Sequence, residues 1–435
     1  MAALGVAVFC ACGSGGDQGK KIVLGVMVAN DVDVLSQLQL DAIRLAVEHI
    51  NAAGVFDLPL EAVNYSPARG DFIDPEKVEK IVKDLHDIDG AVAYVSNHGR
   101  DNSLVQNRVT NQPEYSDFVR CSGTSAEPTS NLPGYEDSDR SDTFYRTILN
   151  QMYQIDRGAE LFMMKNWLRL GFVHLNDSVG NSSSLYIQMK VGEYAARGMK
   201  FVFDMAVPPG DFVLEDNRAK LDELIELSHG TGIDVLVMGT FQAQTNGIIK
   251  YLTENDFRGM FILSIASFTS DLFAIAKAIP DWLKQPSNNI FLFTPDTCGG
   301  KHCLEFNQMF RERLQQEPAL YSVTSYECAF VIGLAMVYSG QNSPTRLGVK
   351  ENMRQFKEKN YTGSETEVGI GAQEFARAAQ LIREGKRVDF AGASGRIFFD
   401  ENGDRPTQGM CLVGPNATVT GWENKECFDE NMEPL

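Results

Sequence analysis

The sequence predicts an α/β protein made of two lobes, each built on a doubly wound parallel sheet. Short β-branched runs alternate with amphipathic helical stretches from Lys21 onward, the pattern of parallel sheets that helices cover on both faces. The alternation comes in two successive series. The chain has 435 residues, of which 43% are hydrophobic and 22% charged, enough for two hydrophobic cores.

The first series supplies four strands and the helices between them. Its first helix has apolar residues at helical spacing, as in Leu40 and Ile43, and the next has Asp74 as its N-cap. Ser103 is expected to open a third helix, and the fourth strand runs into a polar loop. The expected strands are residues 22–29, 60–65, 90–95 and 118–121, the loop is 122–128, and the first two helices end at Gly54 and cover 74–85.

The second series follows residues 144–147 and repeats the alternation. Its expected helices are 151–166, 183–197, 218–228 and 245–254, and its strands are 170–175, 200–207, 234–239 and 260–264. The remainder is expected to add a strand at 290–294, helices at 303–315, 326–338, 347–357 and 373–383, a late strand at 392–400 and a turn at 401–404. The Asn-Gly pair in that turn tolerates positive φ.

Charge and hydropathy exclude two classes of partner. The net charge is −19, and no basic cluster offsets it, so nucleic acid and anionic membrane faces would be repelled. No run approaches the roughly 20 apolar residues of a membrane-spanning helix. The body is therefore expected to be soluble and to bind no nucleic acid.

The N-terminus resembles a bacterial lipoprotein signal. Residues 2–11 are an apolar run, and Cys12 follows at once with a Gly/Ser tether behind it. Cleavage before Cys12 would free it for lipidation, so residues 1–20 are expected to be signal, lipid attachment and tether. The protein would then be exported to the periplasm or the outer face of the cell membrane and held by its lipid alone. A plain start on a cytoplasmic protein is the alternative, because the run is short and lacks basic residues.

Six further cysteines, an even number in an exported chain, predict disulfides. Cys298 and Cys303 could close a tight turn, and Cys411 and Cys427 could staple a C-terminal hairpin. The complete connectivity stays open, since six cysteines allow fifteen pairings. Zinc bound by Cys303 and neighbouring His302 is the rival interpretation, but no second Cys/His pair stands at finger spacing, so no metal site is expected.

Several phrases, in order and across residues 21–404, resemble the type I periplasmic solute-binding proteins, specifically the branched-chain amino-acid-binding family of ABC importers. The phrases are residues 22–26, 46–54, 144–147, 177–180, 232–237 and 392–404. Amino-acid-binding ectodomains of receptors share this fold, and so do some regulators, so the fold alone leaves the role open.

The resemblance implies two lobes joined by a three-crossing hinge, with a ligand held between them. The crossings would fall near 146–150, 266–275 and 390–395. Lobe 1 would consist of residues 21–147 plus 276–391, and lobe 2 of residues 148–275 plus 392–435. Ligands of open α/β sheets bind beyond the carboxyl ends of the strands, where helix N-termini offer free N–H groups.

Lobe 1 is expected to bind a carboxylate of the ligand. Ser103 would offer its hydroxyl and N–H groups at a helix start. The Ser/Thr-rich loop after the fourth strand matches the loop that the family uses for the same group, and its candidate residues are Ser122, Thr124 and Ser125.

Lobe 2 is expected to close over the ligand with residues 177–180 and 240–244, and Phe268 is a candidate lid residue that could equally belong to the core. The sequence departs from the family here. Val179 stands where an aromatic residue is common, and Gln242 and Gln244 stand where an acid commonly pairs with the ligand's ammonium. A buried ammonium without a charge partner costs several kcal/mol. Either an acid elsewhere takes that role, or the ligand is not a standard α-amino acid; the candidate acids are Glu327, Asp271 and Asp177.

No catalytic or cofactor motif is present in the sequence. The nearest approach to a nucleophile elbow, residues 123–127, lacks the final glycine. We expect no enzyme, no cofactor and no metal, but capture of a small polar ligand and its delivery to ABC permease subunits. A sensory or scaffold lipoprotein of the same fold is the second hypothesis, and a hydrolase on a doubly wound sheet is the third.

Overall fold

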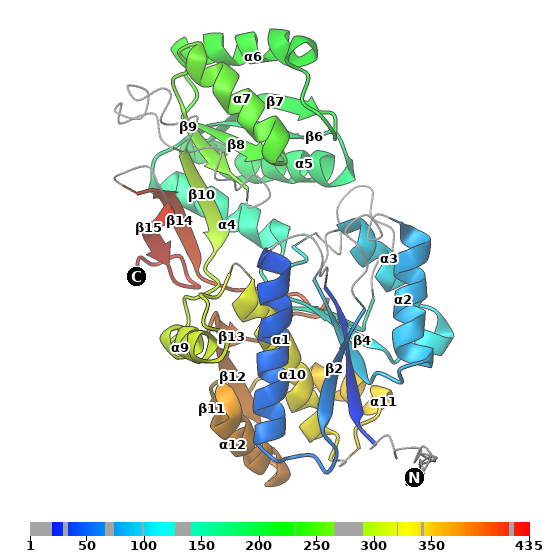
Figure 1. Ribbon diagram of the computed structural model, residues 1–435. Helices are drawn as coiled ribbons and strands as arrows, with labels where there is room; N and C mark the ends of the chain where they lie inside the picture. Colours follow the sequence, from blue (N-terminus) through cyan, green and yellow to red (C-terminus); the bar gives the residue numbers. More distant parts are fainter. Residues whose placement is uncertain are drawn as a thin grey trace, which may run out of the picture.

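The computed structural model describes residues 20–435 except 29–33, 66–73, 98–99, 127–140, 231, 265–289, 320, 341–342 and 417–421. Figure 1 shows two lobes, one above the other, with the first lobe at the bottom. Within the described part of the chain, no helix combines the length and apolar character that a membrane crossing requires.

The first lobe contains a five-stranded, fully parallel sheet of order β2-β1-β3-β4-β5. Its strands are β1 (Ile22–Met27), β2 (Leu60–Asn64), β3 (Ala93–Ser96), β4 (Val119–Ser122) and β5 (Phe144–Arg146). The helices of this lobe are α1 (Val34–Ala52), α2 (Pro75–Asp87), α3 (Arg100–Thr110), α9 (Cys303–Leu314), α10 (Ser322–Tyr338), α11 (Arg346–Met353) and α12 (Gly371–Arg383). One core joins a sheet face to α1, α10 and α12, and another joins the opposite face to α2.

Helix α10 is the centre of the first lobe. Every residue from Ser322 to Val337 is buried, so protein surrounds the helix on all sides. This burial explains why most of its residues are apolar all the way round. A small sheet of order β11-β12-β13 packs against the same core, and the sequence analysis did not anticipate it. Its strands are β11 (Thr366–Val368), β12 (Val388–Gly392) and β13 (Gly395–Ile397).

The second lobe contains a seven-stranded sheet of order β15-β14-β10-β9-β8-β6-β7. Strands β6 to β10 are parallel, and the hairpin β14–β15 extends the sheet in antiparallel fashion. The strands are β6 (Arg169–Leu175), β7 (Lys200–Val207), β8 (Val235–Gly239), β9 (Met260–Leu263), β10 (Ile290–Pro295), β14 (Met410–Pro415) and β15 (Trp422–Phe428). The helices are α4 (Gln151–Met164), α5 (Ser178–Glu193), α6 (Leu214–His229) and α7 (Gln242–Glu254).

Two of the three expected lobe boundaries are wrong. Residues 290–295 were assigned to lobe 1, but β10 pairs in parallel with β9 of the second sheet, so the chain leaves this lobe only after Pro295. Residues 395–397 were assigned to lobe 2, but β13 pairs with β12 in the first lobe. The expected crossing at 266–275 lies outside the described residues. The crossings of the structure are 147–150, 296–302 and 398–409.

These crossings determine how the two sheets face each other. Strands β5 and β10 both leave their sheets at the carboxyl end and lead directly into the other lobe. At the first crossing, the N–H of Gln151 donates to the carbonyl of Ala126 at 2.5 Å, which joins the loop after β4 to the start of α4. The carboxyl edges of both parallel sheets therefore face the region between the lobes.

Two local expectations also need correction. Helix α3 begins at Arg100, not at Ser103, and the strand expected at 392–400 is the second half of a tight hairpin between β12 and β13. Gly392 and Gly395 flank the turn, and Gly395 has a positive φ of 108° that favours glycine. The turn at 401–404 is present, since the N–H of Gly403 donates to the carbonyl of Asp400 at 3.2 Å.

Candidate functional site between the lobes

The loop after β4 is fixed against the start of α10. The hydroxyl of Ser122 accepts the N–H groups of Thr124 at 3.4 Å and Ser125 at 3.0 Å, which forms a compact turn. Gly123 packs so closely that a Cβ there would lie 2.7 Å from the backbone nitrogen of Ser325. Its carbonyl accepts the hydroxyl of Thr324 at 2.7 Å. The loop is therefore preorganised at the edge of the first sheet.

Ser103 has a different place from the one expected. It lies in the first full turn of α3, is 1% exposed, and its hydroxyl is 3.0 Å from the hydroxyl of Ser125. Ser103 neither opens the helix nor faces outward, so the expected helix start is wrong, while its contact with a ligand carboxylate stays a prediction. Ser103 and Ser125 join α3 to the loop after β4.

Thr124 is the residue of this loop whose hydroxyl has no partner within the described part of the chain. Its Oγ1 is buried, while the residue as a whole is half-buried. A buried hydroxyl without a hydrogen-bond partner destabilises the folded protein, so a ligand or a water molecule that bonds to it is favoured. Within this loop, Thr124 is therefore the side chain that stays a candidate contact for a solute.

Two buried arginines beneath the loop were missed. Arg120 and Arg146 both lie against the Phe144 ring, with guanidinium carbons 3.8 and 4.7 Å from its centroid. Arg120 donates to the carbonyl of Ser103 at 3.3 Å, and Arg146 donates to that of Ser125 at 2.7 Å. Arg146 also pairs with a buried Asp404 at 2.6 Å. The adjacency of Phe144 and Arg146 was visible in the sequence, but nothing there showed that both arginines are buried.

The second lobe contributes the N-terminus of α5. Asp177 is its N-cap, and its carboxylate accepts the N–H of Gly180 at 2.7 Å. A Cβ on Gly180 would lie 2.0 Å from the carbonyl oxygen of Leu175, so the helix start approaches β6 closely because this residue is glycine. The side chains of Val179 and Gln242 and all of Phe268 lie outside the described residues.

Gln244 connects two segments of the second lobe by a hydrogen bond. It is 2% exposed and donates its amide N–H to the carbonyl of Gly210. Nearby, the hydroxyls of Thr240 and Thr245 lie 2.7 Å apart at the start of α7. Gln244 therefore connects the loop after β7 to α7, and the structure gives it this bracing position rather than one exposed to a ligand.

Glu327 binds other residues of the protein, and its pairing with a ligand ammonium stays a prediction. It is fully buried in α10 and accepts the N–H and the hydroxyl of Ser394 at 2.8 and 2.6 Å. Arg405 donates to the same hydroxyl at 2.6 Å and to the carbonyl of Thr147 at 3.0 Å. Burial raises the pKa of Glu327 to about 7, against the opposing effect of Arg405. The cluster joins α10 to the first and third crossings.

Six cysteines among the described residues form three disulfides. Cys298 pairs with Cys303 and Cys411 with Cys427, as expected from the sequence, and the third joins Cys121 to Cys328. The third connects β4, just before the Ser122 turn, to α10.

The disulfides also bear on the zinc hypothesis. Among the described residues, the group placed closely enough to hold a metal is Asp296 with Cys411 and Cys427. Those two sulfurs are bonded to each other, so neither is a thiolate ligand. Cys303, the cysteine of the rival zinc interpretation, is bonded to Cys298.

The comparisons with solved structures concern the fold. LivJ of Streptococcus pneumoniae, a branched-chain amino acid transporter substrate-binding protein in complex with isoleucine, is similar with a TM-score of 0.66 and 13% identity over 96% of this chain and 99% of its own. The leucine-binding protein LivK of Thermotoga maritima has a TM-score of 0.66 and 14% identity, over 94% and 99%. An ABC transporter substrate-binding protein of Desulfitobacterium hafniense, in complex with Leu, has 0.63 and 16%, over 93% and 100%.

The family comparison covers most of the chain. None of the curated proteins compared with the chain matches it. The model of the receptor family ligand binding region matches residues 38–410, which include most of both lobes and the three crossings. The resemblance to type I periplasmic binding proteins is thus confirmed for the fold, and the chain belongs to the receptor ligand-binding-region family.

Proposed function

We propose that the protein is an extracytoplasmic solute-binding lipoprotein that captures a small polar solute, an amino acid or a related compound, between its lobes and delivers it to an ABC importer. The observation that carries the proposal is the pair of polar groups at the facing sheet edges: the buried hydroxyl of Thr124 on one side and the Asp177 cap of α5 on the other. Similar structures that hold leucine or isoleucine support it.

The two edges suit opposite ends of a zwitterion. Thr124 would donate its hydroxyl to a carboxylate, and the buried guanidinium of Arg120 lies beneath the same loop. Asp177, which is half-buried, can accept an ammonium in addition to the N–H that it caps, since a carboxylate has about four acceptor positions. Asp177 thus takes the role that the Gln242 to Gln244 stretch leaves open. Val179, Gln242 and Phe268 remain proposed contacts.

A thermal-shift screen tests the proposal. The disulfide-bonded protein is screened against amino acids, small amides, short peptides, carboxylates, polyamines and nucleosides. A solute present at 100 times its dissociation constant should add about 2.7 kcal/mol of stability, and it should be recovered chemically unchanged. A well-folded sample that no solute stabilises would contradict capture, and product formation would contradict a purely binding role.

The threonine side of the site gives a direct prediction. Thr124→Ala should weaken the solute found in the screen roughly tenfold or more, because a hydrogen bond to a charged group contributes about 1.5–3 kcal/mol. Isothermal titration calorimetry measures it. Thr253→Ala is the matched control, because that hydroxyl donates within α7 to the carbonyl of Ile249 at 2.8 Å and should leave affinity unchanged. Equal affinities for the wild type and Thr124→Ala would remove Thr124 from the site.

Asp177, the acidic residue of the proposed site, gives a second prediction. Asp177→Asn keeps the helix cap, since Asn and Asp cap equally well, but removes the charge. We expect the affinity for a zwitterionic or cationic solute to fall by about 2 kcal/mol or more, and the melting temperature of the free protein to stay nearly the same. Unchanged affinity for such a solute would assign the ammonium to another group.

The proposed export rests on Cys12, which lies outside the described residues. Cys12→Ala should abolish incorporation of labelled palmitate and release the protein from the membrane fraction of its host. Retention of the label in this variant would contradict lipidation at Cys12.

A sensory role is the second candidate, and one observation favours it: the matching family model describes ligand-binding regions of receptors. A solute that stabilises the protein, while cross-linking in the host recovers a receptor and no permease, would favour sensing over import.

A further inference from the structure

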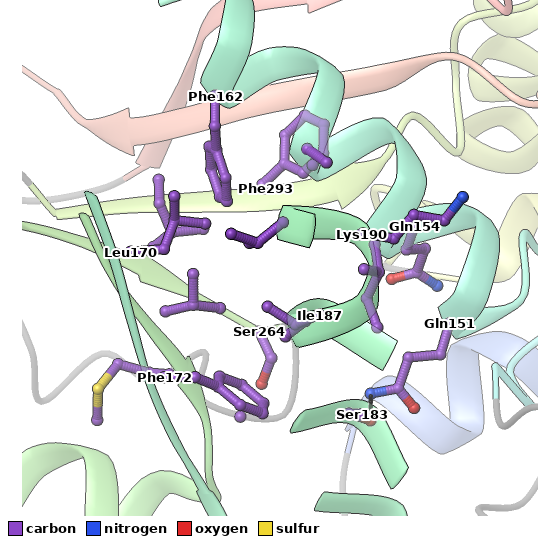
Figure 2. A pocket seen from close by; sticks show the side chains of 18 of the residues that line it. Gln151, Gln154, Phe162, Leu170, Phe172, Ser183, Ile187, Lys190, Ser264 and Phe293 are labelled. Carbon is purple, nitrogen blue, oxygen red and sulfur yellow. Dashed lines mark hydrogen bonds between the residues drawn. The ribbon is translucent and has the colours of Figure 1, made fainter. Parts of the chain in front are cut away.

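The second lobe contains a cavity between its helices and its sheet (Figure 2). Helices α4 and α5 line one side of it, and strands β6, β8, β9 and β10 line the other. Every residue that lines it belongs to the second lobe, and its volume is about 120 Å³. The proposed solute site, in contrast, needs residues from both lobes.

Most of the cavity wall is apolar. Phe162, Leu170, Phe172, Ile187 and Phe293 project toward it from the two helices and the sheet (Figure 2). A cavity of similar size lined by Leu, Ile and Phe stays dry in another protein and binds benzene. The volume and the lining therefore suit a single aromatic ring.

One end of the cavity is polar, and its side chains are fixed. Gln151 donates its amide N–H to the hydroxyl of Ser183 at 2.8 Å, and Gln154 donates to the carbonyl of Leu149 at 2.7 Å. Each amide uses one of its two N–H groups in these bonds, so each still offers an oxygen acceptor and one N–H donor. A ligand with a hydroxyl group, which can both donate and accept, suits this end of the cavity.

The charge at this end is balanced within the protein. Lys190, which also lines the cavity, pairs with Asp156 at 3.1 Å and with Glu193 at 3.0 Å. Asp156 further accepts the hydroxyl of Tyr186 at 2.9 Å. A carboxylate ligand would have to compete with two acids for one ammonium group, which favours an uncharged ligand.

Gly158 keeps the cavity open. It lies inside α4, where glycine is less favourable than alanine, and a Cβ there would meet only the Phe293 ring, at 3.9 Å. An ordinary side chain at this position would therefore fit the backbone but occupy the cavity. Helix α4 thus has glycine, the least favourable helix residue after proline, at the position where any larger side chain would fill the cavity.

We propose that this cavity is a second binding site, for an uncharged molecule of about the size of one aromatic ring that carries a hydroxyl group. The ring contacts Phe162, Phe172 and Phe293, and the hydroxyl donates to the amide oxygen of Gln151 or Gln154. This site is independent of the solute proposed for the region between the lobes.

Phenol and toluene are the probes, observed by saturation-transfer NMR with titration to obtain dissociation constants. Phenol should bind more tightly than toluene by roughly fivefold, the equivalent of one neutral hydrogen bond. Gly158→Leu should abolish the binding of both. Gly192→Ala in α5, where a Cβ would meet nothing within 4 Å, is the matched control and should bind both probes like the wild type.

Two further variants keep the test decisive. If Gly158→Leu does not fold, Gly158→Ala, whose Cβ makes only an ordinary contact, should still weaken phenol severalfold. Thr124→Ala should leave phenol binding unchanged, so failure of the solute site and failure of this one are distinguishable. Equal phenol binding by the wild type and both Gly158 variants, or no binding to the folded wild type, would overturn the proposal.

Discussion

Replacing Cys121 and Cys328 together by alanine is expected to lower the free energy of unfolding by about 5 kcal/mol, the largest effect among the three disulfides of the described residues. The bond closes a loop of 207 residues, and in the chain-entropy account a cross-link stabilises by restricting the unfolded chain, more so for longer loops. It also lies beside the Ser122 turn, between β4 and α10. Its loss should therefore weaken solute binding as well as stability.

The other two disulfides are internal controls for this prediction. Cys411–Cys427 spans 16 residues and Cys298–Cys303 spans 5, so their alanine pairs should cost about 3 and about 2 kcal/mol. Urea unfolding of the three double variants measures the loss of unfolding free energy for each disulfide, and thus their order. A cost for the Cys121–Cys328 pair no larger than that of the Cys298–Cys303 pair would contradict the loop-length explanation.

Arg405→Met should destabilise the protein by about 3–5 kcal/mol at pH 8, because it removes the positive charge nearest to the buried Glu327 carboxylate. Arg405 is 1% exposed and donates to Ser394, Thr147 and Thr407, so its loss also leaves buried acceptors unpaired. The loss should be smaller at pH 5, where Glu327 can be neutral. Urea unfolding at the two pH values checks it, with the exposed Arg311→Met as control.

The sign of this pH dependence follows from the pKa of Glu327. Burial raises it from 4.5 to about 7 in the folded state, so the contribution of this group to stability is fully present below pH 4.5 and is lost as the pH rises through 7. Glu327→Gln removes the titration, so wild type should lose stability relative to this variant between pH 5 and pH 8. A difference between the two that stays constant with pH would contradict a raised pKa.

The sequence was sufficient for most of the elements and for the two-lobed α/β architecture, because hydrophobic periodicity and caps act locally. Asp74, for example, caps α2 as expected, accepting the N–H of Glu76 at 3.0 Å. Hydrophobic periodicity does not show which strands are neighbours in a sheet. Strand β10 reads as a buried strand in either lobe, and only its pairing with β9 places it in the second sheet. The lobe boundaries failed for this reason.

The candidate site was predictable to the extent that it lies on loops at the carboxyl ends of parallel strands. The Ser122 to Ser125 loop lies at the end of β4 in the first lobe, and Asp177 lies at the start of α5 in the second lobe. The burial of Ser103 and Glu327 was not predictable, because side-chain direction and burial depend on packing across more than 20 and 65 positions of sequence, as their contacts with Ser125 and Ser394 show. Polar residue type and position after a strand do not contain that information.

Small-angle X-ray scattering, with and without a saturating concentration of the solute found in the screen, tests most directly whether both lobes hold one ligand. If the solute joins Thr124 to Asp177, the bound protein should be more compact, with a smaller radius of gyration, and the change should disappear in Asp177→Asn at the same solute concentration. A solute that binds the wild type tightly while its scattering stays that of the free protein would contradict closure of the lobes.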